Sequence, residues 1–600
     1  MSDPMVTSVK QSARAPTNSV PPHDVVASAA IPVTMDGMFG HLHPASGETG
    51  VVFCAPWGFD ALCTVKFHRL IAADLAQRGY PAIRFDYPGE GDSLPVEAGA
   101  TFDIWVAGAL RAAEELRDRT GCSRIIYYGM GIGAAVALRA GQQDANLAGY
   151  VLAASTLNGR RYLRETALRE KIIEDGLAID FGYPEGSTVL ASFIMDPHLA
   201  ADLKALTVSI DGMTAGLPTL VLARPENAAD IELAEQMSSA GAAVECIDFS
   251  GYGAMLDGVV TSPIPLELID TIGNWFSRNI PQDTGSLARQ AADNEPPALQ
   301  TSMFRERPEI VDSRLFGISC APRLGGEKAV IILLNMAYAP HTGWGRIWVE
   351  TARTLARQGI ATLRVDLSNI GDSPADPKGP DQVVYSEDQL NDVHAVVRHV
   401  RNSTKAPILL AGICSGAHSA LCAGATNAEV AGIVSINQLR LVLDPDEDVD
   451  SLLMAGARPL SDYKRRATSL STYKRVFSGE VNIPKAAWNI ASHARDRVLR
   501  GISPYLGGFT KLGRLRGRLF ALLRRLEDRK VPVIFISCRT DGSLDQQRLY
   551  FGKTLAGQRA FPGLRHILLE NADHTLSPPS VRQHVIGILA EAAEESAKRG

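Results

Sequence analysis

The chain contains two copies of one sequence pattern, and this duplication restricts the fold more than any other feature of its 600 residues. The segments LAQRGYPAIRFDYPGEGDS (75–93) and LARQGIATLRVDLSNIGDS (355–373) align without a gap, and their aspartates, Asp86 and Asp366, lie 280 positions apart (366 − 86). An internal repeat should be identified first, because it determines the whole architecture. We therefore expect two domains of the same kind in tandem.

Each copy continues with the same order of patterns. An amphipathic segment (about 102–119 and 386–402) leads to a short apolar run, RIIYYG (124–129) or PILLAG (407–412), and then to a glycine turn and an Ala-rich segment. Short apolar runs that alternate with helical patterns are typical of parallel strands in βαβ units. The sequence therefore predicts an α/β fold twice, each domain being a mainly parallel sheet with helices on both faces.

Length and local composition predict the domain boundaries. Because α/β units often reach 250 residues, two large domains fit this length better than several small ones. Residues 1–24 are rich in Pro, Ser and Asn and are expected to form a disordered tail, and residues 281–304 read as a linker. The domains would then span 25–280 and 305–600, the second with a helical cap insertion at about 443–530.

Composition argues against several classes of partner. A net charge of −6 gives no reason to expect nucleic acid or an anionic membrane surface. The eight cysteines are scattered without a CxxC pair or a Cys/His cluster, so we expect no metal, and no motif indicates a cofactor. The N-terminal sequence has no apolar segment typical of a signal peptide, and no apolar stretch is long enough to span a membrane. We therefore expect a cytoplasmic protein, and its oligomeric state is left open.

The glycine turn of the second half carries a cysteine. It reads Gly412-Ile413-Cys414-Ser415-Gly416, between a predicted strand and a predicted helix, which is the context of a nucleophile elbow. At a helix N-terminus, backbone N–H groups and the helix dipole favour a thiolate. Ser415 is a rival nucleophile, but Cys414 holds the central position. The equivalent turn of the first half has Gly131 at the centre, where no nucleophile is possible.

An acid and a histidine should follow the nucleophile, each after a late strand. The second half offers Asp541 after VPVIFISC and His574 after HILLENAD, so that Cys414, Asp541 and His574 come in the expected order. His574 would take the thiol proton and Asp541 would orient the imidazole. Asp545 is the alternative acid, and Asp573, next to the histidine, is expected to be exposed.

The first half lacks both of these groups as well. Glu226 or Asn227 stands near the acid position, and Gly253 or Ala254 stands in for the histidine. With Gly131 in the turn, the first domain is expected to be a pseudoenzyme.

Two backbone N–H groups are expected to form an oxyanion hole. The N–H of Ser415, directly after the nucleophile, would supply one donor, and the loop after the first core strand would supply the other, for which we choose the Ala337 N–H. His418, one turn along the predicted helix, is interpreted as structural.

Taken together, the FDYPGEGDS segment, the glycine elbow and the DHTLS tail resemble the α/β-hydrolase superfamily, over about 30–280 and 305–595. More narrowly, the first half is similar to the type 2 hydrolases associated with exosortase A systems. The second half resembles type 1, through GICSGAHSAL, GIVSINQLRL and YKRVFSGEVNIPKAAW. This resemblance implies acyl-thioester chemistry in the company of acyl carrier proteins.

We therefore expect an acyl-transfer enzyme, a thioesterase or esterase or else an acyltransferase, with an acyl-thioester intermediate on Cys414. Its substrates would be small acyl thioesters or esters, including acyl groups on CoA or on a carrier protein. Two alternatives stay open, namely a non-catalytic scaffold built from two degenerate domains and a thiol-dependent lyase or isomerase on the same fold. The cap sequence is basic and would present either solvated helix faces or a docking surface for an acidic partner such as an acyl carrier protein.

Overall fold

A computed structural model describes residues 30–177, 179, 181–210, 215–225, 227–257, 263–282, 297–444, 446–449 and 510–599. Of the segments expected above, the tail 1–24 and most of the cap 443–530 lie outside these ranges, as do residues 283–296 of the expected linker. The described residues belong to two compact units, one formed by 384–576 and the other by 30–383 together with 577–599.

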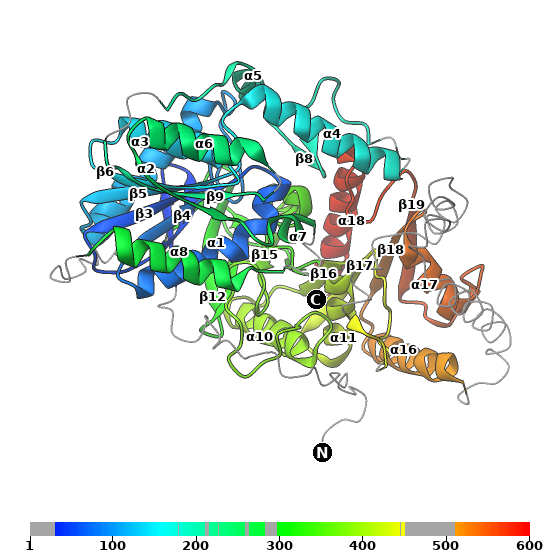
Figure 1. Ribbon diagram of the computed structural model, residues 1–600. Coiled ribbons are helices and arrows are strands. Elements are labelled where there is room, and N and C mark those ends of the chain that lie inside the picture. The colour runs from blue at the N-terminus through cyan, green and yellow to red at the C-terminus, as the bar shows by residue number, and fades with distance from the viewer. Residues whose placement is uncertain are drawn as a thin grey trace, which may run out of the picture. The chain divides into compact units, whose positions relative to one another are not determined.

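The larger unit contains an eight-stranded sheet in the order β1-β2-β4-β3-β5-β6-β9-β10 (Figure 1). Its first two strand pairings are antiparallel and the pairings from β4 onward are parallel. Central strands consist of uniformly buried residues, as expected for a sheet covered on both faces. The strands are β1 (Ile31–Met35), β2 (Met38–His43), β3 (Thr49–Cys54), β4 (Ala82–Phe85), β5 (Arg124–Met130), β6 (Leu147–Ala153), β9 (Pro218–Ala223) and β10 (Ala243–Asp248), and β7 (Val189–Leu190) pairs with β8 (Phe193–Ile194) in a separate hairpin.

Helices cover both faces of this sheet. Figure 1 shows α1 and α8 on one face and α2, α3 and α6 on the other, and each face has its own cluster of buried apolar side chains. Thr101 caps α2 by accepting a hydrogen bond from the Ile104 N–H, which is the usual role of threonine before a helix. The helices are α1 (Phe59–Gln77), α2 (Phe102–Thr120), α3 (Gly133–Gln143), α4 (Gly159–Leu177), α5 (Pro197–Ala205), α6 (Ala228–Ser239), α7 (Tyr252–Asp257) and α8 (Leu266–Asn279).

The same unit also contains the start of the second repeat and the C-terminal helix. Five strands follow one another in the order β11-β12-β13-β15-β14, with β14 and β15 parallel, and α9 packs against β13, β15 and α18. The short strand β11 lies inside the segment expected to be a linker. These elements are β11 (Leu299–Gln300), β12 (Phe304–Val311), β13 (Leu315–Pro322), β14 (Val330–Leu334), η1 (Trp344–Arg346), α9 (Ile347–Arg357), β15 (Ala361–Val365) and α18 (Pro579–Ala597).

The repeated Asp and Ser of the sequence motif close the same turn in both copies. Asp86 accepts a hydrogen bond from the Asp92 N–H (2.8 Å), and Asp366 accepts one from the Asp372 N–H (2.9 Å). In each copy the motif serine then donates to the backbone carbonyl of that aspartate. The constant spacing of 280 residues thus reflects a structural turn that is present twice.

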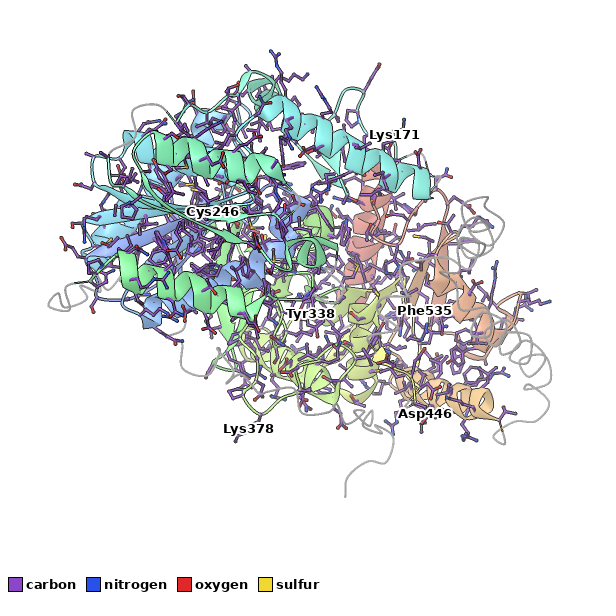
Figure 2. All side chains as sticks on the ribbon, viewed as in Figure 1. Lys171, Cys246, Tyr338, Lys378, Asp446 and Phe535 are labelled. Carbon is purple, nitrogen blue, oxygen red and sulfur yellow. The ribbon has the colours of Figure 1, made fainter. Side chains whose placement is uncertain are left out.

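The smaller unit is a parallel βα arrangement. Its strands follow the order β16-β17-β18-β19, all parallel, as predicted from the apolar runs of the second half. Phe535, labelled in Figure 2, is fully buried in β18. The elements are α10 (Glu387–Ser403), β16 (Ile408–Ile413), α11 (Ser415–Thr426), β17 (Val430–Ile436), α16 (Lys511–Asp528), β18 (Val533–Cys538), α17 (Gly542–Phe551), η3 (Ala556–Ala560) and β19 (Leu564–Leu569).

The strands, glycine turns and flanking helices predicted for both halves are present, and the chain has two α/β domains with mainly parallel sheets. Among the described helices, none is long and apolar enough to cross a lipid bilayer.

Candidate active site

Cys414 occupies a strained turn between β16 and α11. Its φ and ψ are 58° and −113°, a conformation that residues with a Cβ rarely adopt, and its N–H donates to the Ile436 carbonyl (2.9 Å). The turn needs glycine at its start, because a Cβ on Gly412 would lie 2.3 Å from the backbone of Gly416. Strand and helix therefore approach closely, and the thiol is left at the N-terminus of α11.

The first half has the same backbone turn without the thiol. Gly131 has a φ of 57°, and its N–H donates to the Ala153 carbonyl (3.0 Å), just as the Cys414 N–H donates to Ile436. The turn geometry is therefore retained in both halves, and only the second half carries a reactive side chain there.

Asp541 and His574 form a buried pair. His574 Nδ1 lies 2.7 Å from Asp541 Oδ2, and the exposed fractions of the two side chains are 13% and 4%. Asp541 also caps α17 by accepting from the Ser543 N–H (2.8 Å). The helix start thus fixes the carboxylate, and the carboxylate orients the ring, leaving Nε2 for another partner.

Charges around His574 favour its protonated form. Burial alone lowers the pKa of the imidazole, but the carboxylate of Asp541 and the sulfur of Cys414 outweigh burial and raise this pKa well above its usual value. Burial also raises the pKa of Asp541, yet the His574 charge and the hydrogen bonds from His574 and Ser543 bring it below the usual range. The structure therefore brings Cys414, His574 and Asp541 together, with the imidazole between the thiol and the carboxylate.

The two other aspartates considered as the acid have different partners. Asp545 is exposed and lies 3.7 Å from Arg548 in a surface ion pair. Asp573 was expected to be exposed, and this is wrong, because it is 5% exposed and accepts a hydrogen bond from the Thr575 hydroxyl (2.6 Å). Asp541 is the carboxylate that His574 contacts.

Asn437 supports the histidine loop, a role that sequence patterns did not indicate. Its side-chain amide donates to the His574 carbonyl (2.9 Å) and accepts from the Cys538 N–H (2.9 Å), so it links the ends of β17 and β18 to the loop after β19. In the first half, Ala154 follows β6 just as Asn437 follows β17, and both have a positive φ (45° and 47°). Aligning the two strand ends would have marked Asn437 as a polar residue at an otherwise apolar position.

The remaining predicted residues of this site are placed as follows. Ser415 is fully buried at the first turn of α11. His418, on the same helix, directs Nδ1 to the Arg440 carbonyl (2.9 Å), and burial lowers its pKa to about 4, in keeping with a structural role. Ala337 follows β14 in the larger unit with a φ of 48° and is buried. Its role as an oxyanion donor stays a prediction.

Three residues described by the structure at the acid and histidine positions of the first half, Asn227, Gly253 and Ala254, have side chains without acid or base function. Asn227 caps α6 by accepting from the Ala229 N–H (3.1 Å), which is the capping role that Asp541 has for α17. Ala254 and Gly253 lie within α7, and Glu226 lies outside the described residues. Asn227 thus keeps the helix cap of the acid position and carries no charge itself.

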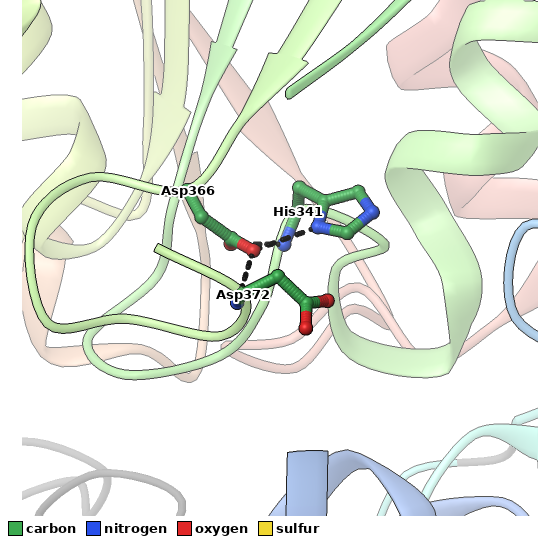
Figure 3. Close-up of side chains that lie close together, drawn as sticks. All are labelled: His341, Asp366 and Asp372. Carbon is green, nitrogen blue, oxygen red and sulfur yellow. Dashed lines mark hydrogen bonds and ion pairs between the residues drawn. The ribbon is translucent and has the colours of Figure 1, made fainter. Parts of the chain in front are cut away.

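A second cluster of charged side chains is buried in the larger unit. His341, Asp366 and Asp372 offer nitrogen and oxygen atoms within 4.8 Å of one another, close enough to hold a metal ion (Figure 3). However, His341 Nδ1 lies 2.8 Å from Asp366 and Nε2 lies 2.7 Å from Asp92, so carboxylates already occupy both ring nitrogens. Burial opposes protonation of His341, but Asp92 and Asp366 raise its pKa well above the usual value. This geometry fits an imidazolium between two carboxylates better than a metal ligand.

The same unit contains a cavity of about 120 Å³. His41 and His68 line it, and in each the Nε2 atom has no hydrogen-bond partner within the described ranges. Burial lowers the pKa of His41 to about 4 and that of His68 to about 3, so both rings are neutral at pH 7. Residues of both halves line this cavity, those of the second half being Pro340, His341, Thr342, Arg346 and Asp372.

Of the eight cysteines, Cys246 on the edge strand β10 is exposed (Figure 2). Burial raises the pKa values of Cys422 and Cys538, the two other thiols of the smaller unit. Cys422 Sγ lies 3.5 Å from His418 Nε2, but burial lowers the pKa of that imidazole to about 4. The imidazole beside Cys414, that of His574, is instead paired with the carboxylate of Asp541.

Comparison with known proteins agrees with this architecture. The model of the alpha/beta hydrolase family matches residues 336–582, and the model of the family described as serine aminopeptidase, S33, matches residues 63–177. No curated protein shows significant similarity to the chain.

Several solved structures are similar at low sequence identity. Est1E from Butyrivibrio proteoclasticus with bound ferulic acid is 13% identical, with 48% of this chain and 96% of that chain covered and a TM-score of 0.28. The proline iminopeptidase of Mycobacterium smegmatis is 12% identical, with 49% and 99% covered and a TM-score of 0.31. An esterase from Pyrococcus furiosus is 13% identical, with 50% and 97% covered and a TM-score of 0.30.

The two family models match different halves of the chain, and each half has the sheet order, glycine turn and flanking helices described above. The chain therefore has two α/β domains in tandem, and the second is similar to the alpha/beta hydrolase family over most of its length.

Proposed function

We propose that the second domain is a hydrolase or acyltransferase in which Cys414 is the nucleophile and carries the acyl group as a thioester. The observation that supports this most is the Asp541–His574 pair, 2.7 Å apart, with the Cys414 sulfur acting on the same imidazole. A nucleophile, a base within reach and a group that orients the base are the components that covalent acyl transfer requires.

The reaction would proceed in two steps, acylation and deacylation of Cys414. In the first, His574 takes the thiol proton and the Cys414 sulfur attacks the carbonyl carbon of the substrate. A C–S bond forms, the bond from the carbonyl carbon to the leaving sulfur or oxygen breaks, and the leaving thiol or alcohol departs with the proton from His574. In the second, water or an acceptor hydroxyl or amine attacks the acyl-enzyme, His574 takes its proton, and the C–S bond breaks to return the free thiol.

Charge that develops on the carbonyl oxygen would be stabilised by the N–H of Ser415 at the start of α11, with the Ala337 N–H proposed as the second donor. The thiol favours thioesters and activated esters as substrates, including acyl groups on CoA or on a carrier protein. An acidic carrier protein is also the partner we propose for the basic cap sequence.

The test is mass spectrometry of the intact protein after incubation with a panel of acyl-CoA thioesters and 4-nitrophenyl acetate. We expect an adduct of one acyl mass, localised to Cys414 by peptide mapping and absent from Cys414→Ala. Cys422→Ala is the matched control, because it removes another thiol of α11 and should keep the adduct. Equal labelling of Cys414→Ala and wild type would instead favour a non-catalytic scaffold.

A further inference from the structure

Tyr385 has a backbone conformation that is costly for a bulky side chain. Its φ is 66°, in the left-handed region, and it is 5% exposed directly before Ser386, the N-cap of α10. Such outliers persist only where surrounding contacts enforce them, and they cluster at functional sites. This conformation therefore calls for a reason beyond helix capping.

A hydrogen-bond chain holds this conformation in place. The Tyr385 N–H donates to the Gln389 side-chain oxygen (3.0 Å), and the same oxygen accepts from the Ser419 hydroxyl (3.1 Å). Ser419 lies on α11, the helix that Cys414 begins, and Gln389 is buried on α10. The backbone of Tyr385 is thus fixed relative to the helix that carries the nucleophile.

The phenol of Tyr385 is directed towards the turn that carries Cys414. Its ring meets the His418 ring edge-on, with centroids 5.1 Å apart. The hydroxyl is buried and has no hydrogen-bond partner of good geometry within the described part of the chain. Burial raises the pKa of this hydroxyl well above its usual value, and the neighbouring group that raises it most is Cys414. A buried, unsatisfied donor is costly unless a partner forms at some stage of the protein's function.

An internal comparison separates function from folding. In the first half, Thr101 is the N-cap of α2 as Ser386 is of α10, and the residue before it is Ala100. Ala100 is also buried but does not have a positive φ. The fold therefore needs neither the phenol nor the strain at this position, and both occur in the half that has a nucleophile.

We propose that the Tyr385 hydroxyl donates a hydrogen bond to the Cys414 sulfur once His574 has taken the thiol proton, and so stabilises the thiolate–imidazolium pair. This inference rests on the proposed function only in taking Cys414 as the nucleophile. Tyr385 is then a positioning residue, since it acts through the sulfur and needs no contact with the acyl group.

The charged groups that act on Tyr385 and on His574 come from several elements. Asp541 and His574 approach from the ends of β18 and β19, and Arg440 and Glu447, paired at 2.6 Å, follow β17. None of these groups is altered by Tyr385→Phe, which removes one oxygen atom and no formal charge.

The test follows alkylation of Cys414 by iodoacetamide between pH 5 and pH 10, quantified by peptide mass spectrometry. Hydrogen bonds to charged groups are strong enough that losing one should move the alkylation profile of Tyr385→Phe to higher pH by about one pH unit or more. Tyr550→Phe is the matched control, because Tyr550 is equally buried in the same unit and its charged neighbours are Arg440, Glu447 and Asp444. It should leave the alkylation profile unchanged.

The outcomes separate this inference from the proposed function. Superimposable alkylation profiles for Tyr385→Phe and wild type overturn the inference, even if acyl adducts form. If the profile is unchanged but acylation is slower, the Tyr385 hydroxyl would instead donate a hydrogen bond to the acyl oxygen. A shifted profile without any acyl adduct supports the inference and counts against the proposed function. If Tyr385→Phe does not fold by circular dichroism, Gln389→Ala, which frees the Tyr385 backbone, should shift the profile in the same direction.

Discussion

Arg84 of the first repeat donates a hydrogen bond to Asp372 of the second across 2.8 Å, and Arg364 of the second repeat pairs in turn with Asp92 of the first. The two pairs join equivalent positions of the two repeats. Arg364 lies 280 positions after Arg84 (364 − 84), and Asp372 lies 280 positions after Asp92 (372 − 92). When position i of one copy contacts position j of the other, and position j of the first contacts position i of the second, the interface is isologous and has twofold symmetry. Here such an interface is built within one chain.

A second pair of contacts follows the same relation. Lys66 donates to the Asn369 side chain (2.6 Å), and Arg346 donates to the Gly89 carbonyl, again with offsets of 280 (346 − 66 and 369 − 89). The first domain therefore has a structural function, because its Lys66, Arg84 and Asp92 side chains bind polar groups of the second repeat.

Asp92→Asn should destabilise the larger unit strongly. Asp92 accepts hydrogen bonds from both Arg364 and His341, and the Arg364 side chain is fully buried. Removing one partner of a buried pair leaves an uncompensated charge, which costs roughly 3–5 kcal/mol. Asp372→Asn should cost less, because the Asp372 carboxylate accepts one hydrogen bond from a charged side chain, Arg84, whereas the Asp92 carboxylate accepts two. Urea unfolding followed by the fluorescence of Trp57, Trp105, Trp275 and Trp348 measures both variants.

The half-exposed pair of Arg278 and Glu245 provides the control for this prediction. Arg278→Gln should change stability by at most about 1 kcal/mol, as is usual for surface pairs. Equal unfolding midpoints for Asp92→Asn and Arg278→Gln would show that the buried network contributes nothing.

The His341 cation should make the stability of this unit depend on pH. Because Asp92 and Asp366 raise the pKa of His341 in the folded state above that of a free imidazole, the folded state holds the proton more tightly. The resulting stabilisation is fully present below about pH 6.5 and is lost as the pH rises through the folded pKa. Buried neutral histidines such as His41 make stability rise with pH instead. They are present both in wild type and in a variant that lacks His341, so their contribution cancels when the two are compared.

His341→Gln isolates this contribution. The difference in free energy of unfolding between wild type and His341→Gln should be largest below pH 6.5 and should shrink as the pH rises above it. Urea titrations at half-unit intervals from pH 6 to pH 9 follow the trend, and a difference that grows with pH would mean that His341 is neutral in the folded protein.

Asp541→Asn should slow acylation of Cys414 by about 10²–10⁴-fold, the usual contribution of general acid–base catalysis. Asparagine keeps the cap of α17, because Asn and Asp are equivalent N-caps, so the fold should be retained. The readout is the burst of 4-nitrophenol from 4-nitrophenyl acetate. Asp545→Asn should match wild type, since Asp545 pairs with Arg548 on the surface. A loss confined to Asp545→Asn would reverse the assignment of the acid.

Sequence patterns predicted those parts of the molecule that depend on neighbours along the chain. The glycine turn around Cys414 and the late strands before Asp541 and His574 are local signals, and the topology of a parallel sheet brings their ends to one edge. The contacts of Asn437 and Tyr385 depend instead on residues from other elements, and neither residue belongs to a recognisable motif. The expectation for Asp573 failed because the Thr575 hydroxyl satisfies its carboxylate without solvent.

Restoring the nucleophile of the first domain should not restore a site. Gly131→Cys places a side chain at a φ of 57°, where Pro56 would lie 3.3 Å from its Cβ, so we expect a loss of about 1–2 kcal/mol of stability. The introduced thiol would still lack an acid at Asn227 and a base at Ala254. In a Cys414→Ala background, peptide mass spectrometry should therefore find no acyl adduct at position 131 after exposure to 4-nitrophenyl acetate.

Gly131→Cys also tests whether the backbone turn alone, or the side chains around it, makes the thiol of Cys414 reactive. Both turns have nearly the same φ (57° and 58°) and stand at the start of a helix, so helix-terminal N–H groups act on either thiol. If the turn alone activated cysteine, Gly131→Cys would react with iodoacetamide as fast as Cys414 at pH 7. We expect it to react more slowly than Cys414, because Asn227, Ala254 and Ala100, at the described positions equivalent to Asp541, His574 and Tyr385, provide no carboxylate, imidazole or phenol.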